Sequence, residues 1–470
     1  MQTPAPPSLP NTTAAYIREI ALEQRQYFAQ GLTHSIAFRQ KQLHRLMELV
    51  TQNEAAILEA LHKDLGKPTF ESYASEVGFM KEEIRYTLKK GKHWAKPQKV
   101  HTPLVHWPSK SFIQPEPKGT VLIIAPWNYP FQLLLAPLVA ALAAGNTVLL
   151  KPSEQAPHTA VLLEKLVQKY FDPQVVGVVQ GEGQVVIPLL IAQKPQHVFF
   201  TGSTAVGRKI AEMAAPHLIP VTLELGGKSP AIVEASANLK IAARRIAFGK
   251  WLNAGQTCVA PDYVLVHKEV QESFLEILKN TLQEFYPENP LHSGDYGHII
   301  NEGHYQRIQS YLAQGQVYYG GESDGQSLTI APTILHPVSQ EAPVMQEEIF
   351  GPVLPVLAFA ERQEAQGIIA RNPNPLALYI FAEKAQEQEP YWRSVPFGGG
   401  AINNTIIHLS NPALPFGGLG NSGMGNYHGE AGFRTFSHYK SIVKTATWFD
   451  LRKKYPPYTK LSLKIIKRFM

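Results

Sequence analysis

Cys258 is the residue whose chemistry most needs an explanation, because it is the only cysteine among the 470 residues of the chain. A single thiol has no disulfide partner in its own chain, and Cys258 lacks the neighbours that a zinc site requires. It is therefore either a packed, inert side chain or a nucleophile. Free cysteines are usually buried, which favours packing, and the segment Gly255-Gln256-Thr257-Cys258 does not decide between the two by itself.

Two polar residues elsewhere could assist a nucleophile. Asn128 lies between Pro126 and Pro130, so its backbone is stiff, and its side-chain amide could donate to a developing oxyanion. Glu224 ends an apolar segment, where partial desolvation would raise its pKa toward that of a useful general base. Both have an ordinary interpretation as well. Asparagine is a common turn residue, and a glutamate at the end of a strand can lie in solvent.

A turn rich in Gly, Ser and Thr could bind phosphate. Gly202, Ser203 and Gly207 follow a predicted strand and open a predicted helix, where free N–H groups and the helix dipole attract anions. The two glycines have the spacing of a P-loop, but Arg208-Lys209 stands where Lys-Ser/Thr is required. The G-x-G-x-x-G fingerprint is also missing, so this turn is a weak indication of nucleotide binding.

Two further polar segments acquire meaning only in context. Lys151 and Glu154 follow a predicted strand at its carboxyl end, where they could contact ribose hydroxyls or a phosphate, although a plain polar loop is the alternative. Glu348 and Phe350 belong to a segment that pairs acids with an aromatic before a tight turn. No cluster suggests a metal site, and no motif suggests nucleic-acid binding.

Short apolar strands alternate with helices in the segment that carries these residues. We expect helices at residues 131–144, 159–170, 185–193 and 206–215, and strands at residues 121–125, 147–150, 175–179, 197–200 and 221–225. This alternation predicts a parallel, doubly wound sheet that binds a nucleotide at the carboxyl ends of its strands. An earlier helix is predicted at residues 53–65, with Asn53 as its cap. A strand at 263–267 and a helix at 270–285 predict a second α/β domain.

Composition limits the class of protein. Hydrophobic residues make up 44% of the chain and charged residues 17%, which fits a packed globular protein of two or three domains and argues against disorder. A single cysteine is compatible with a reducing compartment, and the first residues show no signal-peptide pattern. We therefore expect a cytoplasmic protein, with membrane association left open by its C-terminus.

The end of the chain is basic and amphipathic. Apolar residues at 461, 463, 465, 466 and 469 alternate with the lysines there, a pattern that suits an anionic membrane surface. A solvated tail, or a tail docked on a partner subunit, is an equally good interpretation. From residue 440 onward Asp450 is the only acidic residue, and the basic residues are Lys440, Lys444, Arg452, Lys453, Lys454, Lys460, Lys464, Lys467 and Arg468.

Taken together and in chain order, these segments resemble the aldehyde dehydrogenase superfamily, and most closely its class 3 and fatty aldehyde branch. The resemblance runs over nearly the whole chain. It is carried by Pro126-Trp127-Asn128-Tyr129-Pro130, Lys151-Pro152-Ser153-Glu154, Phe200-Thr201-Gly202-Ser203, Leu223-Glu224-Leu225-Gly226-Gly227-Lys228, Gly255-Gln256-Thr257-Cys258, Glu347-Glu348-Ile349-Phe350-Gly351-Pro352 and Pro415-Phe416-Gly417-Gly418.

The resemblance implies roles for individual residues. Cys258 would attack the aldehyde carbon, Asn128 would hold the oxyanion, and Glu224 would activate the water that hydrolyses the thioester. Oxidised NAD or NADP would be the cofactor, and the sequence does not decide between the two. The residues implied at the cofactor are Lys151, Glu154, Gly202, Ser203, Gly207, Leu225, Glu348 and Phe350.

The resemblance also implies an architecture and a substrate class. Residues 13–95 and 116–224 would form a Rossmann-type cofactor domain, and 225–410 the catalytic domain. Residues 96–115 and 411–445 would bridge to a second copy in a homodimer, and 446–470 would be the basic tail. Fatty aldehyde members carry a C-terminal membrane anchor, which this tail does not match. The expected substrate is an apolar aldehyde of medium or long chain, or an aromatic or apocarotenoid one.

Two other functions stay open on the sequence. The same thiol could serve a cofactor-independent thiol esterase, or the chain could be a non-catalytic NAD-binding protein on the same fold.

Overall fold

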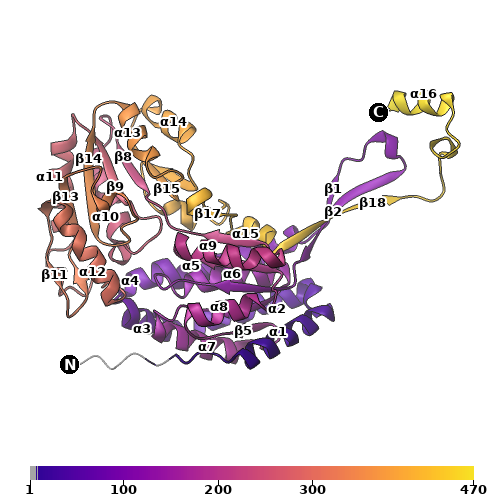
Figure 1. The fold of residues 1–470 in the computed structure, drawn as a ribbon, viewed down its shortest axis with the longest axis horizontal. Helices are drawn as coiled ribbons and strands as arrows, with labels where there is room; N and C mark the ends of the chain where they lie inside the picture. The colour runs from indigo at the N-terminus through magenta and orange to yellow at the C-terminus, as the bar shows by residue number, and fades with distance from the viewer. Residues whose placement is uncertain (1–6, 8, 470) are drawn as a thin grey trace.

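The computed structural model describes residue 7 and residues 9–469, and of Ile465 and Phe469 it describes only the backbone. The predicted apolar pattern at those two positions therefore lies outside the described side chains. Two α/β domains lie next to each other, and a long three-stranded arm extends from one of them (Figure 1).

The first domain is built on a six-stranded sheet that is parallel except for one short edge strand. The five predicted strands all form, and they pair in parallel. The sheet order is β17 (Gly423–Met424), β7 (Val221–Glu224), β6 (His197–Thr201), β3 (Thr120–Ile124), β4 (Thr147–Lys151) and β5 (Val176–Val178). The chain proceeds from β3 to β5 on one side and then returns to β6 on the other. The order therefore reverses between β3 and β6, where doubly wound sheets bind ligands.

Helices cover this sheet. The predicted helices form as α6 (Gln132–Ala144), α7 (Pro157–Tyr170), α8 (Gly183–Ile191) and α9 (Thr204–Ala214). The others are α1 (Ala14–Ala29), α2 (Ile36–Gln52), α3 (Glu54–Leu65), α4 (Thr69–Ser72), α5 (Gly78–Trp94) and α15 (Gly429–Thr435). Asn53 occupies the N-cap position of α3 as predicted, but its side chain does not cap the helix, because its amide donates to the Leu49 carbonyl and the Tyr170 hydroxyl.

The second domain contains a seven-stranded sheet. Its order is β10 (Gly315–Tyr319), β13 (Thr333–Val338), β14 (Val353–Phe359), β9 (Tyr263–His267), β8 (Pro230–Val233), β15 (Ala377–Phe381) and β16 (Gly399–Ile402). Only β10 pairs antiparallel with its neighbour. The helices are α10 (Leu239–Trp251), α11 (Gln271–Phe285), α12 (Glu302–Tyr311), α13 (Arg362–Ala370) and α14 (Ala385–Ser394), and a small hairpin joins β11 (Ser323–Asp324) to β12 (Thr329–Ile330).

The connection between the two sheets positions the candidate site. Residues 225–229 run from the carboxyl end of β7 directly to the amino end of β8. The segment with Cys258 leads into β9, and the segment with Glu348 leads into β14, so both lie at amino ends of the second sheet. The carboxyl edge of the first sheet therefore meets the amino edge of the second.

The arm is a separate antiparallel sheet. It contains β1 (Gln98–Val100), β2 (Ser109–Pro117) and β18 (Ser437–Thr445), and β2 pairs with β18 over nine residues. The remaining chain ends in α16 (Lys460–Phe469) beyond the far end of the arm (Figure 1). Within the described residues, no helix is both long enough and apolar enough to cross a bilayer.

Candidate active site

Cys258 follows a left-handed stretch of backbone. Asn253, Ala254 and Gly255 have φ angles of 54°, 52° and 76°. Two of these residues carry a Cβ, so the conformation costs about 1–2 kcal/mol at each of them. Contacts with the first domain support the loop, because the Asn253 backbone N–H donates to Glu71 Oε2 at 3.0 Å. The sequence after α10 thus presents the thiol on a turn whose shape is specified by long-range contacts.

We expect Gly255→Ala to damage this turn. A Cβ at Gly255 would lie 2.3 Å from the Gly351 carbonyl oxygen, and φ is positive, so the backbone itself would have to move. The midpoint of thermal unfolding should fall by several degrees, and the rate of alkylation of Cys258 should change at least ~10-fold. Gly367→Ala is the matched control, because nothing lies within 4 Å of that position. An unchanged melting temperature and alkylation rate in Gly255→Ala would show that the turn is not constrained.

The thiol is half-buried and electrostatically disfavoured as a thiolate. Burial, together with the Glu348 and Glu224 carboxyl groups, raises the pKa of Cys258 to about 12. The backbone N–H groups of Cys258 and Val259 oppose this shift. Without a bound cofactor, the side chain is therefore a protonated thiol at neutral pH, and its activation requires a change in its surroundings.

Asn128 lies next to the Cys258 turn. Its Nδ2 donates to the Gln256 carbonyl at 3.0 Å, and this uses one of its two amide hydrogens. Its neighbour Tyr129 shares a hydrogen bond of 2.6 Å with Thr257 Oγ1. The structure therefore places Asn128, the predicted oxyanion donor, on a buried loop that contacts Gln256, two residues before Cys258.

Glu224 is a buried carboxyl group without a partner. It is 2% exposed, and neither of its oxygens has a hydrogen-bond partner among the described residues. Burial raises its pKa well above the usual value, while its charge is near enough to raise the pKa of Cys258. A carboxyl group held in this way can accept a proton far more readily than one in solvent.

The other first-domain candidates lie along the carboxyl edge of the sheet. Lys151 ends β4 and forms an ion pair with Glu154, whose Oε1 accepts from the Gly183 N–H at 2.9 Å. Burial lowers the pKa of Lys151. Burial alone would raise the pKa of Glu154, but Lys151 and the Gly183 N–H outweigh it, and the net shift is downward. The pair is therefore charged and preorganised.

The turn between β6 and α9 is closely packed at the carboxyl edge of the sheet. Ser203 caps α9, with its Oγ accepting from the Val206 N–H. A Cβ at Gly207 would lie 2.6 Å from a methyl of Leu225, so the glycine allows α9 to pack against the end of β7. A Cβ at Gly202 would meet the Phe200 ring at 2.5 Å. The N-terminus of α9 therefore lies close to the carboxyl edge of the first sheet, which is where a phosphate site would need it.

Glu348 and Phe350 come from the second domain and face the same edge. Glu348 is half-buried, and one of its oxygens is without a partner among the described residues. Burial, and then Asp262, raise the pKa of Glu348 to about 8. A Cβ at Gly226 would lie 1.9 Å from its Oε2, so the glycine is needed for this approach. Phe350 packs edge-to-face on Trp127 with ring centroids 5.4 Å apart.

Two buried ion pairs that the sequence analysis missed hold these loops. Lys67 pairs with Glu76 at 2.5 Å and also donates to the Asn128 carbonyl at 3.2 Å. Lys228 pairs with Asp262 at 2.5 Å and donates to the Glu347 carbonyl at 3.0 Å. Only Lys228 had a local signal, since it ends the Gly226-Gly227-Lys228 segment. Lys67 and Glu76 lie far from every motif, and nothing in their own segment points to the site.

The residues present fit a dinucleotide. A charged pair lies at the end of β4, a helix N-terminus lies at the end of β6, and the unpartnered Glu348 oxygen lies across the domain boundary. A thiol, a side-chain amide and a buried carboxyl group lie beyond them. The arrangement can therefore perform nucleophilic chemistry beside a redox cofactor.

Comparisons with known proteins identify the family of this chain. A model described as the aldehyde dehydrogenase family matches residues 8–442. The 4,4'-diaponeurosporen-aldehyde dehydrogenase of Staphylococcus aureus is 47% identical over 95% of this chain and 97% of its own length. The dimeric, NADP-preferring aldehyde dehydrogenase of Rattus norvegicus is 44% identical over 94% of this chain and 98% of its own. Further relatives are named as family 3 members.

A solved structure extends the match to three dimensions. The substrate-bound state of Staphylococcus aureus AldH superimposes with a TM-score of 0.94 and 46% sequence identity. The match covers 96% of this chain and 99% of that one. This chain therefore belongs to the aldehyde dehydrogenase family, whose enzymes are NAD(P)-dependent oxidoreductases.

Proposed function

We propose that this protein oxidises long, apolar aldehydes to carboxylic acids, with Cys258 as the nucleophile. The observation that carries the proposal is the convergence of three groups where the two sheets meet: the thiol, the Asn128 amide and the unpartnered Glu224 carboxyl. Each group has a separate ordinary interpretation. Their meeting at one place, beside a sheet edge whose residues fit a dinucleotide, favours catalysis.

The first step forms a bond between sulfur and the aldehyde carbon. The Cys258 proton passes to a water molecule, sulfur attacks the carbonyl carbon, and the carbonyl oxygen becomes an oxyanion. The second amide hydrogen of Asn128 and the Cys258 backbone N–H are the donors we assign to that oxygen. Since Asn128 Nδ2 is held by the Gln256 carbonyl, the donor is oriented before substrate arrives.

The residues we assign to the cofactor are Lys151 and Glu154 at the adenosine ribose, the Gly202–Ser203 turn with Gly207 and Leu225 at the pyrophosphate, and Glu348 with Phe350 at the nicotinamide ribose. Bound oxidised NAD or NADP supplies the acceptor for the hydride that leaves the substrate carbon. This loss of hydride converts the sulfur adduct to a thioester on Cys258. Phe350, packed on Trp127, helps to exclude water from that boundary.

Glu224 completes the reaction in this proposal. Its carboxylate takes a proton from water, the water oxygen adds to the thioester carbon, and the C–S bond breaks to release the carboxylic acid and the Cys258 sulfur. Because burial raises the pKa of Glu224, its carboxylate can hold the proton that it takes from water.

We infer that NAD binds at least as well as NADP. Glu154 is held by Lys151 and the Gly183 N–H, and its carboxylate suits a free ribose hydroxyl. A phosphate on that ribose would meet a negative charge, although Lys151 lies beside it. The NADP preference in the name of the rat relative shows that the other choice occurs among its relatives.

Aromatic and neutral side chains near the thiol support an apolar substrate. The Tyr379 hydroxyl donates to the carbonyl of Val259, next to Cys258, at 2.6 Å. The His408 ring lies 6.1 Å from Tyr379, and burial lowers the pKa of His408 to about 4. His428 is likewise neutral, with a pKa lowered to about 3 by burial and then by His408. It stacks on Phe416 at 5.4 Å. Neutral, aromatic surroundings at neutral pH favour an apolar substrate, and the diaponeurosporen aldehyde in the name of the Staphylococcus aureus relative is our model for it.

A chain-length series tests the proposed substrate. We expect kcat/KM, measured by NADH formation, to rise ~10-fold for every two or so methylene groups from propanal to dodecanal, because each buried CH₂ contributes about 0.8 kcal/mol. A C20–C30 polyene aldehyde should react faster still. Glyceraldehyde and betaine aldehyde serve as polar controls. Equal rates for short and long chains, with activity still dependent on NAD or NADP, would overturn the substrate assignment and leave the reaction standing.

We also propose a homodimer and a division of labour within the chain. Residues 13–95 and 116–224 would bind cofactor, 225–410 would carry the thiol, and 96–115 with 411–445 would form the intersubunit arm. One strand and one helix depart from that scheme: β17 and α15 lie within 411–445, but β17 pairs with β7 and α15 packs on α6 of the first domain. The name of the rat relative supports the dimer, and light scattering on the purified chain measures it.

A further inference from the structure

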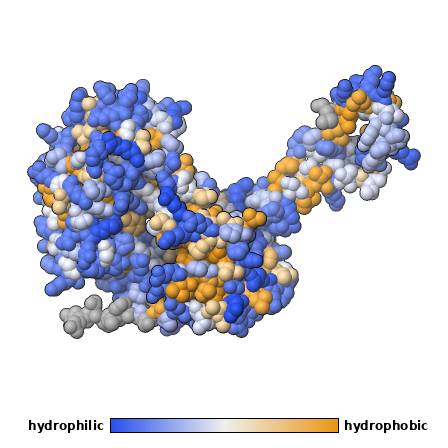
Figure 2. All heavy atoms as spheres, viewed as in Figure 1, coloured by the Kyte–Doolittle hydropathy of each residue, from blue (hydrophilic) through white to orange (hydrophobic). Residues whose placement is uncertain are grey.

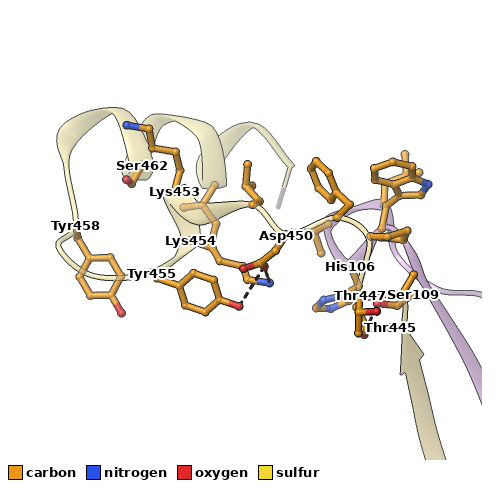
Figure 3. A pocket seen from close by; sticks show the side chains of 18 of the residues that line it. His106, Ser109, Thr445, Thr447, Asp450, Lys453, Lys454, Tyr455, Tyr458 and Ser462 are labelled. Atoms are coloured by element: carbon orange, nitrogen blue, oxygen red, sulfur yellow. Dashed lines mark hydrogen bonds and ion pairs between the residues drawn. The ribbon is translucent and has the colours of Figure 1, made fainter.

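A hollow of about 1200 Å³ lies at the far end of the arm that we assign to a second copy (Figure 3). It is lined by residues 104–109 and by the tail from residue 445 onward. Its place on the proposed intersubunit arm accounts for its apolar lining. The group that the proposed reaction leaves unexplained lies in the interior instead, at Lys250 near the end of α10.

Lys250 is a buried cation without a partner. Figure 2 shows hydrophilic residues over much of the visible surface of the second domain, which is where lysines ordinarily lie. Lys250 is instead 0% exposed, and its Nζ has no hydrogen-bond partner among the described residues. Burial lowers its pKa to about 8, while the charges of Asp262 and Glu348 oppose this shift. An ammonium group in such a place is costly unless an anion compensates it, so its neighbours indicate its role.

The end of α10 is held against the segment that carries Glu348. The Trp251 indole N–H, next to Lys250, donates to the Pro352 carbonyl at 2.8 Å. The charge of Glu348 is near enough to raise the pKa of Lys250. The two side chains therefore belong to one buried network, although they lie far apart in the chain.

Four charged side chains of this network balance: Lys228, Lys250, Asp262 and Glu348. Lys228 pairs with Asp262 at 2.5 Å and donates to two backbone carbonyls at 2.7 and 3.0 Å, which uses all three of its donors. What remains is Lys250, with no partner, and Glu348, one of whose oxygens has none among the described residues. By charge balance, Lys250 is the cation available to Glu348.

We propose that Lys250 is a positioning residue, which keeps Glu348 ionised so that this carboxylate can accept a hydrogen bond from the nicotinamide ribose. The proposal rests on the role of Glu348 in the proposed function. A carboxylate is a stronger acceptor for a ribose hydroxyl than a neutral carboxyl group is. Lys250 acts through Glu348 and does not itself contact the cofactor.

The other charges around Glu348 make such a cation necessary. Burial, and then Asp262, raise the pKa of Glu348 to about 8. Lys228 and Arg307 oppose this shift, but Lys228 is paired with Asp262, and Arg307 donates to backbone carbonyls. A carboxylic acid is ordinarily a far stronger acid than an ammonium group, so the first proton that the Lys250–Glu348 pair loses comes from Glu348.

NADH binding, measured by fluorescence without aldehyde, tests the proposal. Lys250→Met keeps a flexible unbranched side chain but removes the charge, and we expect the Kd for NADH at about pH 7.5 to rise ~10-fold, the difference between a charged and a neutral acceptor. Lys250→Arg keeps the charge and should retain more of the affinity. Lys118→Met is the matched control and should bind as the wild type does. Burial also lowers the pKa of Lys118 to about 8, but it precedes β3 at the opposite edge of the first sheet.

Two readouts separate positioning from packing. Lys250→Met should melt at the wild-type temperature or above it, because it removes a buried charge that has no partner. NADH affinity should rise with pH as Glu348 loses its proton, and in Lys250→Met this rise should move upward by ~1 pH unit. Cys258 and Tyr263, near the pair, stay protonated over this range because burial raises the pKa of both. A lower melting temperature with an unchanged pH profile would assign Lys250 to packing and overturn the proposal.

Glu348→Gln distinguishes this inference from the proposed function. It should weaken NADH binding ~10-fold and remove the rise with pH, and adding Lys250→Met should then weaken binding no further. If Glu348→Gln bound NADH like the wild type, the cofactor role of Glu348 would be wrong, and the role of Lys250 with it. If Glu348→Gln weakened binding but Lys250→Met did not, or if the two losses added, the inference about Lys250 alone would be overturned.

Discussion

Cys258→Ala should abolish aldehyde-dependent formation of NADH or NADPH, with a fall in kcat of more than ~10⁴-fold. No other thiol in the chain can replace it, because Cys258 is the only cysteine. Alanine removes the atom that forms the carbon–sulfur bond but leaves a side chain that fits the same half-buried turn. Initial rates with a saturating aldehyde measure the loss.

Controls separate loss of chemistry from loss of structure. The variant should melt within a degree or two of the wild type and should bind NAD or NADP with unchanged affinity, since the cofactor edge lies on other strands. Wild-type turnover should stop without NAD or NADP, which distinguishes a dehydrogenase from a thiol esterase that uses the same sulfur. A folded Cys258→Ala protein that still oxidised aldehydes would refute the mechanism.

The first sheet was predictable because its strands are buried runs with local signals. Residues 121–125 and 197–200 were expected as strands and form β3 and β6. The rule that parallel sheets bind ligands at their carboxyl ends then located Lys151 and Ser203 correctly along that edge. Local sequence and one topological rule were enough for this half of the site.

The second half of the site depends on contacts that no local pattern reports. Cys258 and Glu348 lie just before β9 and β14, at the amino ends of these strands. The rule that parallel sheets bind ligands at carboxyl ends would have placed them at the opposite edge. The left-handed backbone at Asn253 and Ala254 is specified by partners such as Glu71, far away in the chain. Sequence reasoning could name the thiol, but the three-dimensional packing determines where it points.

The buried ion pairs show the same limit more strongly. Lys67 and Glu76 occur in a charged helical region and look like solvated surface residues in the sequence, yet both are fully buried. Glu76 Oε2 accepts from the backbone N–H groups of Phe131 and Gln132, directly after the Asn128 loop. Leaving either charge without its partner would cost about 3–5 kcal/mol, so the pair is a structural requirement of that loop.

Glu224→Gln should separate the two halves of the reaction. Glutamine has nearly the same shape but cannot take a proton from water. The first turnover should therefore still produce one equivalent of NADH per active site, while steady-state kcat falls ~10²–10⁴-fold, the usual contribution of a general base. Stopped-flow absorbance measures the burst and the later rate in one experiment, and thioester trapped on Cys258 should be detectable by mass spectrometry.

The pH dependence follows from the environment of Glu224. Burial raises its pKa, so the carboxylate fraction, and with it the rate of thioester hydrolysis, should increase with pH across a range above the ordinary glutamate pKa. That rise belongs to Glu224 and should disappear in Glu224→Gln, while Glu234→Gln should retain it. Glu234 is a suitable control because it is another buried carboxyl with a raised pKa, but Tyr391 holds it by a hydrogen bond of 2.7 Å.

If Glu224→Gln also lost the burst, Glu224 would be needed for the attack of the thiol, and the water-activating role would have to pass to another group. The unpartnered state of both Glu224 oxygens favours the water-activating role, because a base that already accepted hydrogen bonds would be a weaker one.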